Sequence, residues 1–307
     1  MEAIKVQRDD DRGVLAMPGR IAGHGLRWTE HVRRAYWNSF QNGCGTTAKA
    51  VAYSAVFAVF PALLVAAACI NLLPDVAPLR SELSIFFDRV LPANVAPLLQ
   101  EFFTGGDHRA PQSVRVLIGA GIVGFTGAAG VIATLMEGFR RTYDLPLNAW
   151  TPWQRRGRAY LLVPISLIPL SVASVLVVFG HLITLMVMEW KQPEVQSLFY
   201  VTANIVRWTV ALSATASVIA MIYRFGTSKD LGWHEVFPGA AFATITWFLT
   251  TLGFGWYVTR FADYSRVYGS LGTGIVLMVW MFLTALSVLC GAELNAELSR
   301  RPSQDGH

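Results

Sequence analysis

Six long apolar stretches set the strictest limit on what this chain can fold into. A helix rises 1.5 Å per residue, so a bilayer core about 30 Å thick is crossed by roughly 20 apolar residues. Six stretches reach that length, and they run over Thr47–Leu73, Val114–Phe139, Ala159–Met188, Phe199–Tyr223, Val236–Val258 and Ser270–Glu293. We therefore expect an all-α, polytopic membrane protein with six transmembrane helices.

The charge content supports this expectation. Charged residues make up only 15% of the 307 residues, whereas a soluble domain carries about 25%. They are confined to short segments between the apolar stretches, as expected for a surface that faces lipid. The net charge of +5 would suggest a nucleic acid partner in a soluble protein, but in a membrane protein Lys and Arg gather on the cytoplasmic side. Nucleic acid is therefore not an expected partner.

The positions of Lys and Arg predict the orientation. Eight of them lie in the leader up to Lys49 and five arginines follow the second stretch, whereas only Lys191 lies between the third and fourth. We therefore expect both termini in the cytoplasm. The predicted parts are a cytoplasmic leader (1–45) with an interfacial helix around Trp28 to Phe40, a transmembrane domain (46–299) and a cytoplasmic tail (300–307).

The connection between the first two stretches, residues 74–112, is too long for a plain hairpin. Its apolar residues recur at spacings of three and four, which predicts amphipathic helix, interrupted at Pro92. Neither half is long enough to span the membrane. We expect this amphipathic segment on the outer membrane face or capping the bundle, either as a lid or interfacial anchor or as a functional gate.

Glycine and proline are frequent inside the predicted spans. Glycine recurs at every third position of the second span, including Gly124 and Gly127. Small residues let helix backbones approach closely, and a flexible helix that lines a substrate path is the alternative. Pro61 and Pro238 each remove a backbone donor and can kink their helices.

Three charges are expected at similar depth near the cytoplasmic ends of the spans. An ion inside the membrane costs several kcal/mol. Lys49 can extend its side chain to the interface or pair with Glu137 or Glu293, the latter followed closely by Asn295. Glu137 can instead pair with the arginines three and four residues after it. These four residues are a candidate gate or packing network.

Arg207 is the most informative charge. It lies eight residues into the fourth stretch, about 12 Å deep at the helical rise. Because arginine stays protonated, it must reach the interface, find a partner, or contact an anion or lipid headgroup in a cavity. Asn204 lies one turn earlier on nearly the same side. Tyr268 and Ser270, at the entrance to the last span, are expected to border the outer mouth of such a site.

The sequence predicts no enzyme, metal site or cofactor. Its three cysteines and six histidines lack metal-ligand spacing. No Ser-His-Asp signature, phosphate-binding Gly-Lys-Ser/Thr loop or Cys-x-x-Cys pair is present.

Three segments together resemble the YihY/BrkB family of bacterial inner-membrane proteins. The first is the Ala-rich span start that ends in Phe-Pro (48–61), and the second is the exit from the second span, LMEGFRRTY (135–143). The third is an ordered set, Phe237-Pro238-Gly239-Ala240, then Tyr257, Tyr268-Gly269-Ser270-Leu271-Gly272 and Gly291-Ala292-Glu293-Leu294-Asn295-Ala296. The resemblance covers roughly residues 30 to 300.

The resemblance implies six transmembrane helices and ties to envelope integrity, serum resistance and export of lipid A precursors. The family has also carried a tRNA-processing ribonuclease label, but this sequence lacks the clustered ligands of a metal nuclease. The leading hypothesis is a transporter or flippase-like protein for an envelope lipid or related amphipathic anion, with membrane lipids as partners. A non-transporting scaffold for envelope-assembly proteins is the alternative, and an ion channel comes third. No oligomeric state is predicted.

Overall fold

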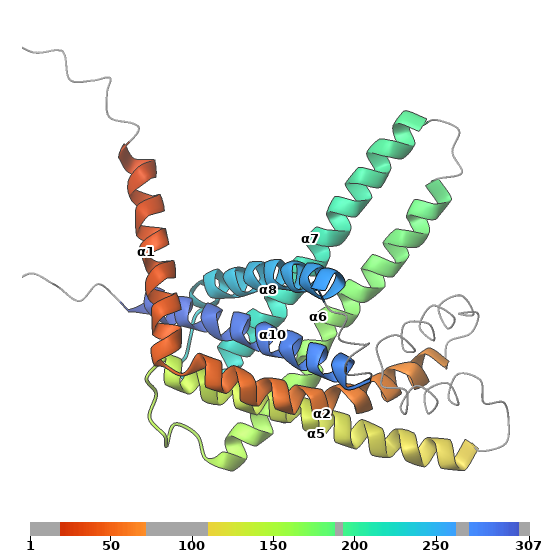
Figure 1. Ribbon diagram of the computed structural model, residues 1–307, viewed down its shortest axis with the longest axis horizontal. Coiled ribbons are helices and arrows are strands. Elements are labelled where there is room, and N and C mark those ends of the chain that lie inside the picture. Colours follow the sequence, from red (N-terminus) through yellow and green to blue (C-terminus); the bar gives the residue numbers. More distant parts are fainter. Residues whose placement is uncertain (1–18, 72–109, 188–192, 262–269, 301–307) are drawn as a thin grey trace, which may run out of the picture.

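The computed structural model describes residues 19–71, 110–187, 193–261 and 270–300, and every regular element within these ranges is helical. A first helix, α1 (Gly19–Gln41), precedes six longer ones (Figure 1). These are α2 (Cys44–Asn71), α5 (Ala110–Thr142), α6 (Pro152–Val187), α7 (Pro193–Gly226), α8 (Trp233–Phe261) and α10 (Ser270–Ser299). The expected all-α polytopic fold is confirmed.

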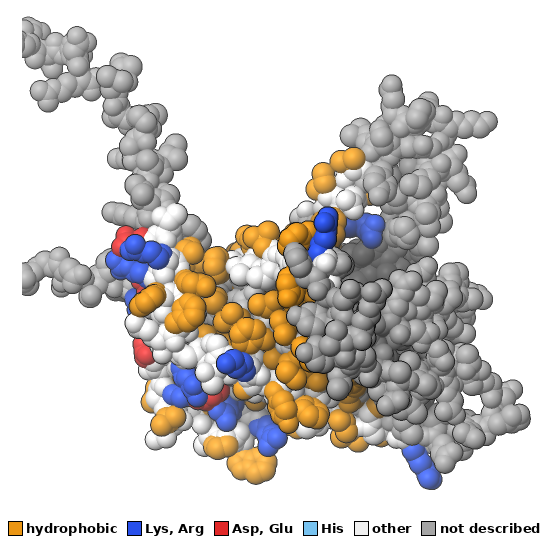
Figure 2. Space-filling model, viewed as in Figure 1, with side chains coloured by type: hydrophobic (Ala, Val, Ile, Leu, Met, Phe, Trp, Pro, Cys, Tyr) orange, Lys and Arg blue, Asp and Glu red, His pale blue; other side chains and the backbone are white. Residues whose placement is uncertain are grey.

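Five of the long helices contain stretches apolar and long enough to cross a membrane. These are Cys44–Leu63, Leu117–Thr142, Val201–Gly226, Trp233–Val258 and Gly274–Ser299. In α6, side chains are described only for residues 152–172, which begin with a polar, arginine-containing turn. Large apolar side chains such as Ile122, Ile205 and Leu249 are about 60% exposed, as helices in lipid require. Figure 2 shows apolar side chains spread over the visible face.

All six long helices extend beyond their predicted stretches at one end of the bundle. For example, α5 ends at Thr142 rather than Phe139, and α6 begins at Pro152 rather than Ala159. In α5, α6 and α7 the extra turns contain arginines, which interrupt an apolar run but are good helix formers. We call this end, which holds Arg140, Arg141 and Arg155, the basic end.

The helices run alternately toward and away from the basic end, and α10 lies at the centre of the packing. It contacts α8, α2, α1 and α5, while α2 packs along α5 and α6 along α7. In Figure 1 the α6–α7 pair runs obliquely away from the other four. Both α1 and the C-terminal end of α10 lie at the basic end, so the two ends of the described chain are on the same side.

Close helix packing is found at the predicted glycines. A Cβ added to Gly127 of α5 would lie 2.8 Å from the Cβ of Ala58, and one added to Gly124 would lie 3.4 Å from the Cβ of Pro61. Helix α2 continues through Pro61. The glycine repeat therefore lets α5 approach α2 at the level of this proline.

The best-packed core lies toward the basic end. Ala48, Phe139, Tyr223 and Leu289, from four different helices, have no exposed surface. The Tyr223 hydroxyl donates to the Val288 carbonyl at 2.5 Å, so helices α7 and α10 are joined by a buried hydrogen bond.

Several sequence predictions lie outside the described residues. Most of the amphipathic segment (74–112), the first 18 residues of the leader and residues 301–307 of the tail are among them. Helix α1 lies within the predicted leader and turns into α2 at Gly43, whose φ of 69° favours glycine. The interfacial role of this leader helix stays a prediction.

Candidate functional site

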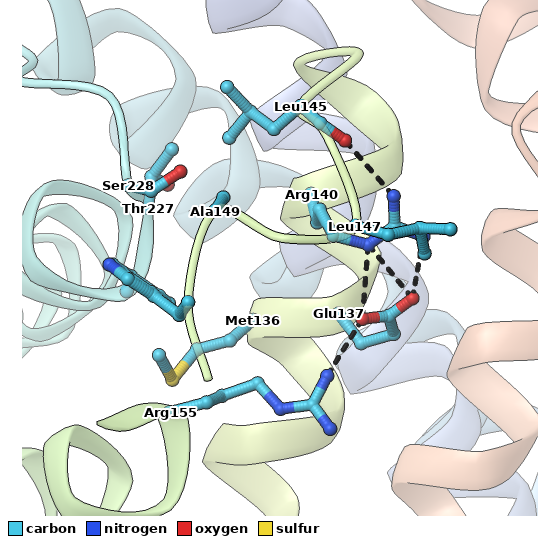
Figure 3. Close-up of a pocket in the computed structure, with 11 residues that line it drawn as sticks. Met136, Glu137, Arg140, Leu145, Leu147, Ala149, Arg155, Thr227 and Ser228 are labelled. Carbon is cyan, nitrogen blue, oxygen red and sulfur yellow. Dashed lines mark hydrogen bonds and ion pairs between the residues drawn. The ribbon is translucent and has the colours of Figure 1, made fainter. Parts of the chain in front are cut away.

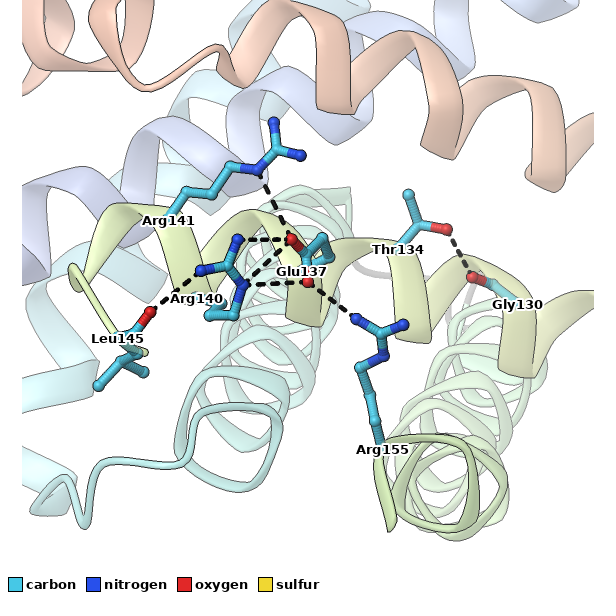
Figure 4. Close-up of polar contacts among 7 residues, drawn as sticks. All are labelled: Gly130, Thr134, Glu137, Arg140, Arg141, Leu145 and Arg155. Atoms are coloured by element: carbon cyan, nitrogen blue, oxygen red, sulfur yellow. Dashed lines mark hydrogen bonds and ion pairs between the residues drawn. The ribbon is translucent and has the colours of Figure 1, made fainter. Parts of the chain in front are cut away.

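Glu137, near the end of α5, is surrounded by three arginines (Figure 4). Arg140 donates to it from Nε and Nη2, the latter at 2.8 Å, and Arg155 donates from Nη1 at 2.8 Å. The Nε of Arg141 lies 3.7 Å away. The predicted local pair is therefore confirmed. Sequence spacing could not indicate Arg155, because it comes from α6, 18 residues further along.

Glu137, Arg140 and Arg155 border two hollows at the basic end. A small cavity of about 30 Å³ lies between the end of α5 and the connection that follows α7, and Met136, Thr227 and Ser228 are among the residues that line it (Figure 3). A larger, open hollow of about 450 Å³ lies beside it and is called the α5–α6 hollow here. It is lined by Glu137, Arg140, Leu147, Asn148, Trp150, Thr151, Pro152 and Arg155.

Glu293 of α10 is the most deeply buried carboxyl in the described part of the chain, at 1% exposed. Its Oε1 accepts hydrogen bonds from the Asn42 amide at 2.8 Å, the Thr142 hydroxyl at 2.9 Å and the Cys44 thiol at 3.6 Å. All three donors are neutral. Nearby, burial raises the pKa of Tyr143, just beyond the end of the α5 span, with the Glu235 and Glu293 carboxyls as smaller causes.

Lys49 does not join this network, which corrects the expected pairing. Its side chain is exposed on α2, and none of the ion pairs among the described residues includes it. The Glu137 carboxylate accepts hydrogen bonds from arginines, and the Glu293 carboxyl accepts hydrogen bonds from neutral side chains. The reason is local: Arg140 and Arg141 lie one helical turn from Glu137, and Arg155 reaches it across the α5–α6 connection.

Asn295 connects α10 to α8 beside Pro238. Its Oδ1 accepts a hydrogen bond from the Gly239 N–H at 2.6 Å, and its Nδ2 donates to the Val236 carbonyl at 3.0 Å. A proline weakens the backbone ladder around it, so backbone groups on both sides of Pro238 can be bound by a side chain. Helix α8 continues through the proline. Asn295 therefore joins α10 to α8 and is fully buried.

Arg207 and Asn204 line one open hollow of about 260 Å³ on α7, together with Trp208 and Ala211. The two residues thus share a site, as expected from their spacing. The Nε of Arg207 is buried and has no hydrogen-bond partner. Trp208 packs edge to face on Phe248 of α8, with 5.5 Å between ring centroids, and this contact fixes one wall of the hollow.

The side chains of the other two residues predicted for this site lie outside the described part of the chain. Tyr268 lies outside the described residues. Ser270 is the first residue of α10, and its side chain also lies outside them. Within the described ranges, no group of three or more His, Cys, Asp or Glu side chains lies close enough together to hold a metal ion.

Comparison with known proteins places these features in a family. The model of the virulence factor BrkB family matches residues 36–307. A UPF0761 membrane protein of Aeromonas salmonicida is 27% identical over 91% of this chain and 93% of its own length. Another, from Ralstonia nicotianae, is 26% identical over 87% of this chain and 57% of its own. The ribonuclease-like protein YfkH of Bacillus subtilis is 30% identical over 59% of this chain and 64% of its own.

The chain thus spans less than two thirds of the length of the last two relatives. No solved structure matches it. The family match covers α2 to α10 and includes Glu137, Arg207, Glu293 and Asn295. The chain belongs to the virulence factor BrkB family of multi-pass membrane proteins.

Proposed function

We propose that this protein moves an anionic, amphipathic envelope lipid or a related anion across the bacterial inner membrane. The observation that carries the proposal is the state of Arg207. Arg207 lies on an apolar span and lines a hollow of about 260 Å³. The Nε of its guanidinium is buried and has no hydrogen-bond partner.

An arginine in this position requires a counter-charge. Its guanidinium stays protonated, and an ion in the bilayer costs several kcal/mol unless it is paired or wet. The arginines at the basic end that surround Glu137 have a carboxylate partner, whereas no ion pair among the described residues includes Arg207. A phosphate headgroup would accept hydrogen bonds from the guanidinium fork.

The surroundings of Arg207 suit a lipid. Ile205 and Trp208 on α7, and Leu249 and Leu252 on α8, expose more than half of their surface. Acyl chains would lie along these side chains while the headgroup contacts Arg207 and Asn204. This arrangement supports an amphipathic substrate over a small inorganic ion.

The orientation is part of the proposal. Lys and Arg of membrane proteins accumulate on the cytoplasmic side. Five arginines flank the α5–α6 connection at the basic end: Arg140, Arg141, Arg155, Arg156 and Arg158. We assign this end, and with it both termini, to the cytoplasm. Arg207 then lies in the outer half of the membrane, and no enzymatic chemistry is invoked.

The test is translocation of a labelled phosphatidylglycerol by the full-length protein in liposomes. Chemical quenching of the label in the outer leaflet measures how fast lipid crosses. The intact protein should accelerate crossing over protein-free liposomes, and R207Q should slow it about tenfold by losing charge-assisted hydrogen bonds. R260Q, an exposed arginine on α8, is the matched control. The proposal would be refuted if the lipid crossed equally fast in liposomes with and without protein, or if it crossed as fast with R207Q as with the intact protein.

A scaffold without transport is the second candidate, and the filled core at the basic end favours it. Ala48, Phe139, Tyr223 and Leu289 leave no exposed surface where four helices meet. A scaffold would retain its partners but move no lipid in the liposome assay. Envelope-assembly proteins would be the partners in that case.

A further inference from the structure

The α5–α6 hollow at the basic end has the form of a second binding site. Its volume is about 450 Å³, and its wall combines the apolar Leu147 and Trp150 with the polar Asn148, Thr151 and Arg155. The hollow lies at the opposite end of the bundle from the half of α7 that carries Arg207, and it shares no lining residue with the Arg207 hollow.

The hollow carries surplus positive charge. Two arginines in its wall, Arg140 and Arg155, share the single lining carboxylate of Glu137, so two positive charges against one negative leave one positive. The Arg141 guanidinium, outside the wall, lies 3.7 Å from the same carboxylate. A further guanidinium, that of Arg158, lies 4.5 Å from the ring centre of Trp150. An anion that enters the hollow is therefore attracted from several sides.

Arg155 has donors left for a ligand. Only its Nη1 takes part in the hydrogen bonds of the described residues, to Glu137, and its side chain is 40% exposed. Arg140 differs, because its Nε and Nη2 donate to Glu137 and its Nη1 to the Leu145 carbonyl. Glu137 thus binds Nη1 of Arg155, a residue that lines the hollow, and leaves its Nε and Nη2 as donors for a ligand.

We propose that the α5–α6 hollow binds a phosphate group, with Arg155 as the contacting residue and Glu137 and Arg140 as positioning residues. The planar guanidinium matches the geometry of two phosphate oxygens. Leu147 and Trp153 beside the hollow are 77% and 84% exposed, as expected for side chains at a membrane interface. They favour a phospholipid headgroup over a free phosphate as the source. The site does not depend on transport or on Arg207.

Binding to the detergent-purified full-length protein tests the proposal. Short-chain phosphatidic acid and inorganic phosphate are titrated separately, with a short-chain diacylglycerol as the phosphate-free control. R155Q should weaken phosphate binding at least about tenfold. R156Q, a neighbouring exposed arginine that does not line the hollow, should leave it unchanged. R155K keeps the charge but loses the fork, and it should bind several-fold more weakly even if R155Q fails to fold.

The outcomes distinguish a lipid headgroup from a free phosphate as the ligand, and they separate this binding site from the transport proposal. Binding of phosphatidic acid alone identifies a lipid headgroup, and comparable binding of inorganic phosphate identifies a free phosphate. R207Q should retain this binding whether or not the transport proposal stands. The proposed site would be refuted if the intact protein bound neither phosphate compound or bound diacylglycerol equally well. It would also be refuted if R155K bound the phosphate compounds as tightly as the intact protein does.

Discussion

Gly239 of α8 and Gly291 of α10 face each other backbone to backbone. A Cβ on Gly239 would overlap the Gly291 carbonyl oxygen, and a Cβ on Gly291 would overlap the Gly239 carbonyl oxygen. Backbone atoms cannot move aside by changing a rotamer. The two helices can therefore lie this close only because both residues lack a side chain, which is the use of small residues expected at helix contacts in membranes.

Substituting Gly291 with alanine should separate α8 from α10. Overpacking of a filled core costs about 1–3 kcal/mol, so we expect a clear fall in the thermal unfolding temperature of the detergent-purified protein. Gly274→Ala on the same helix is the control, since a Cβ there meets nothing within 4 Å. Equal unfolding temperatures for the two variants would contradict the close contact.

Asn295→Ala should destabilise the same contact by a different route. It removes the acceptor for the Gly239 N–H and the donor for the Val236 carbonyl. Polar contacts between membrane helices contribute about 1–2 kcal/mol at most, so a loss of this size is expected in the same unfolding measurement. Asn148→Ala, an exposed asparagine, should be neutral. An N295A protein as stable as the intact one would show that Asn295 does not hold α8.

Glu293 should be replaceable by glutamine but not by alanine. Its three described hydrogen bonds all end on Oε1, and their donors are the neutral side chains of Asn42, Thr142 and Cys44. E293Q retains an acceptor oxygen there, whereas E293A leaves buried donors without a partner, at about 1–3 kcal/mol. Membrane yield and unfolding temperature measure both. A strong defect in E293Q would mean that the negative charge itself is needed.

Sequence periodicity was sufficient for the helices, because a bilayer imposes a minimum apolar length that few other folds share. It also paired residues one turn apart, such as Glu137 with Arg140 and Arg207 with Asn204. It could not pair residues from different helices. Contacts such as Thr142 to Glu293 depend on how helices rotate and cross.

For Lys49, the sequence suggested a contact between helices that the structure does not contain among the described residues. Similar depth suggested a partner for it among the carboxylates, but depth along the membrane does not say which side of a helix a residue occupies. In the structure Lys49 is exposed, while the cations that meet Glu137 come from its own helix and from α6. Arg155 became part of the candidate site only through this tertiary contact.

We therefore expect opposite effects on stability from removing the charge of Glu137 and from removing the charge of Lys49. E137Q leaves Arg140, Arg141 and Arg155 without their shared carboxylate, and their mutual repulsion should lower stability by about 1 kcal/mol, a modest value because the cluster is partly exposed. Added salt screens repulsion between exposed charges, so the loss should shrink as ionic strength rises. K49Q should change neither the stability nor its salt dependence. Unfolding temperatures at low and high salt test both, and a K49Q defect as large as that of E137Q would restore Lys49 to the network.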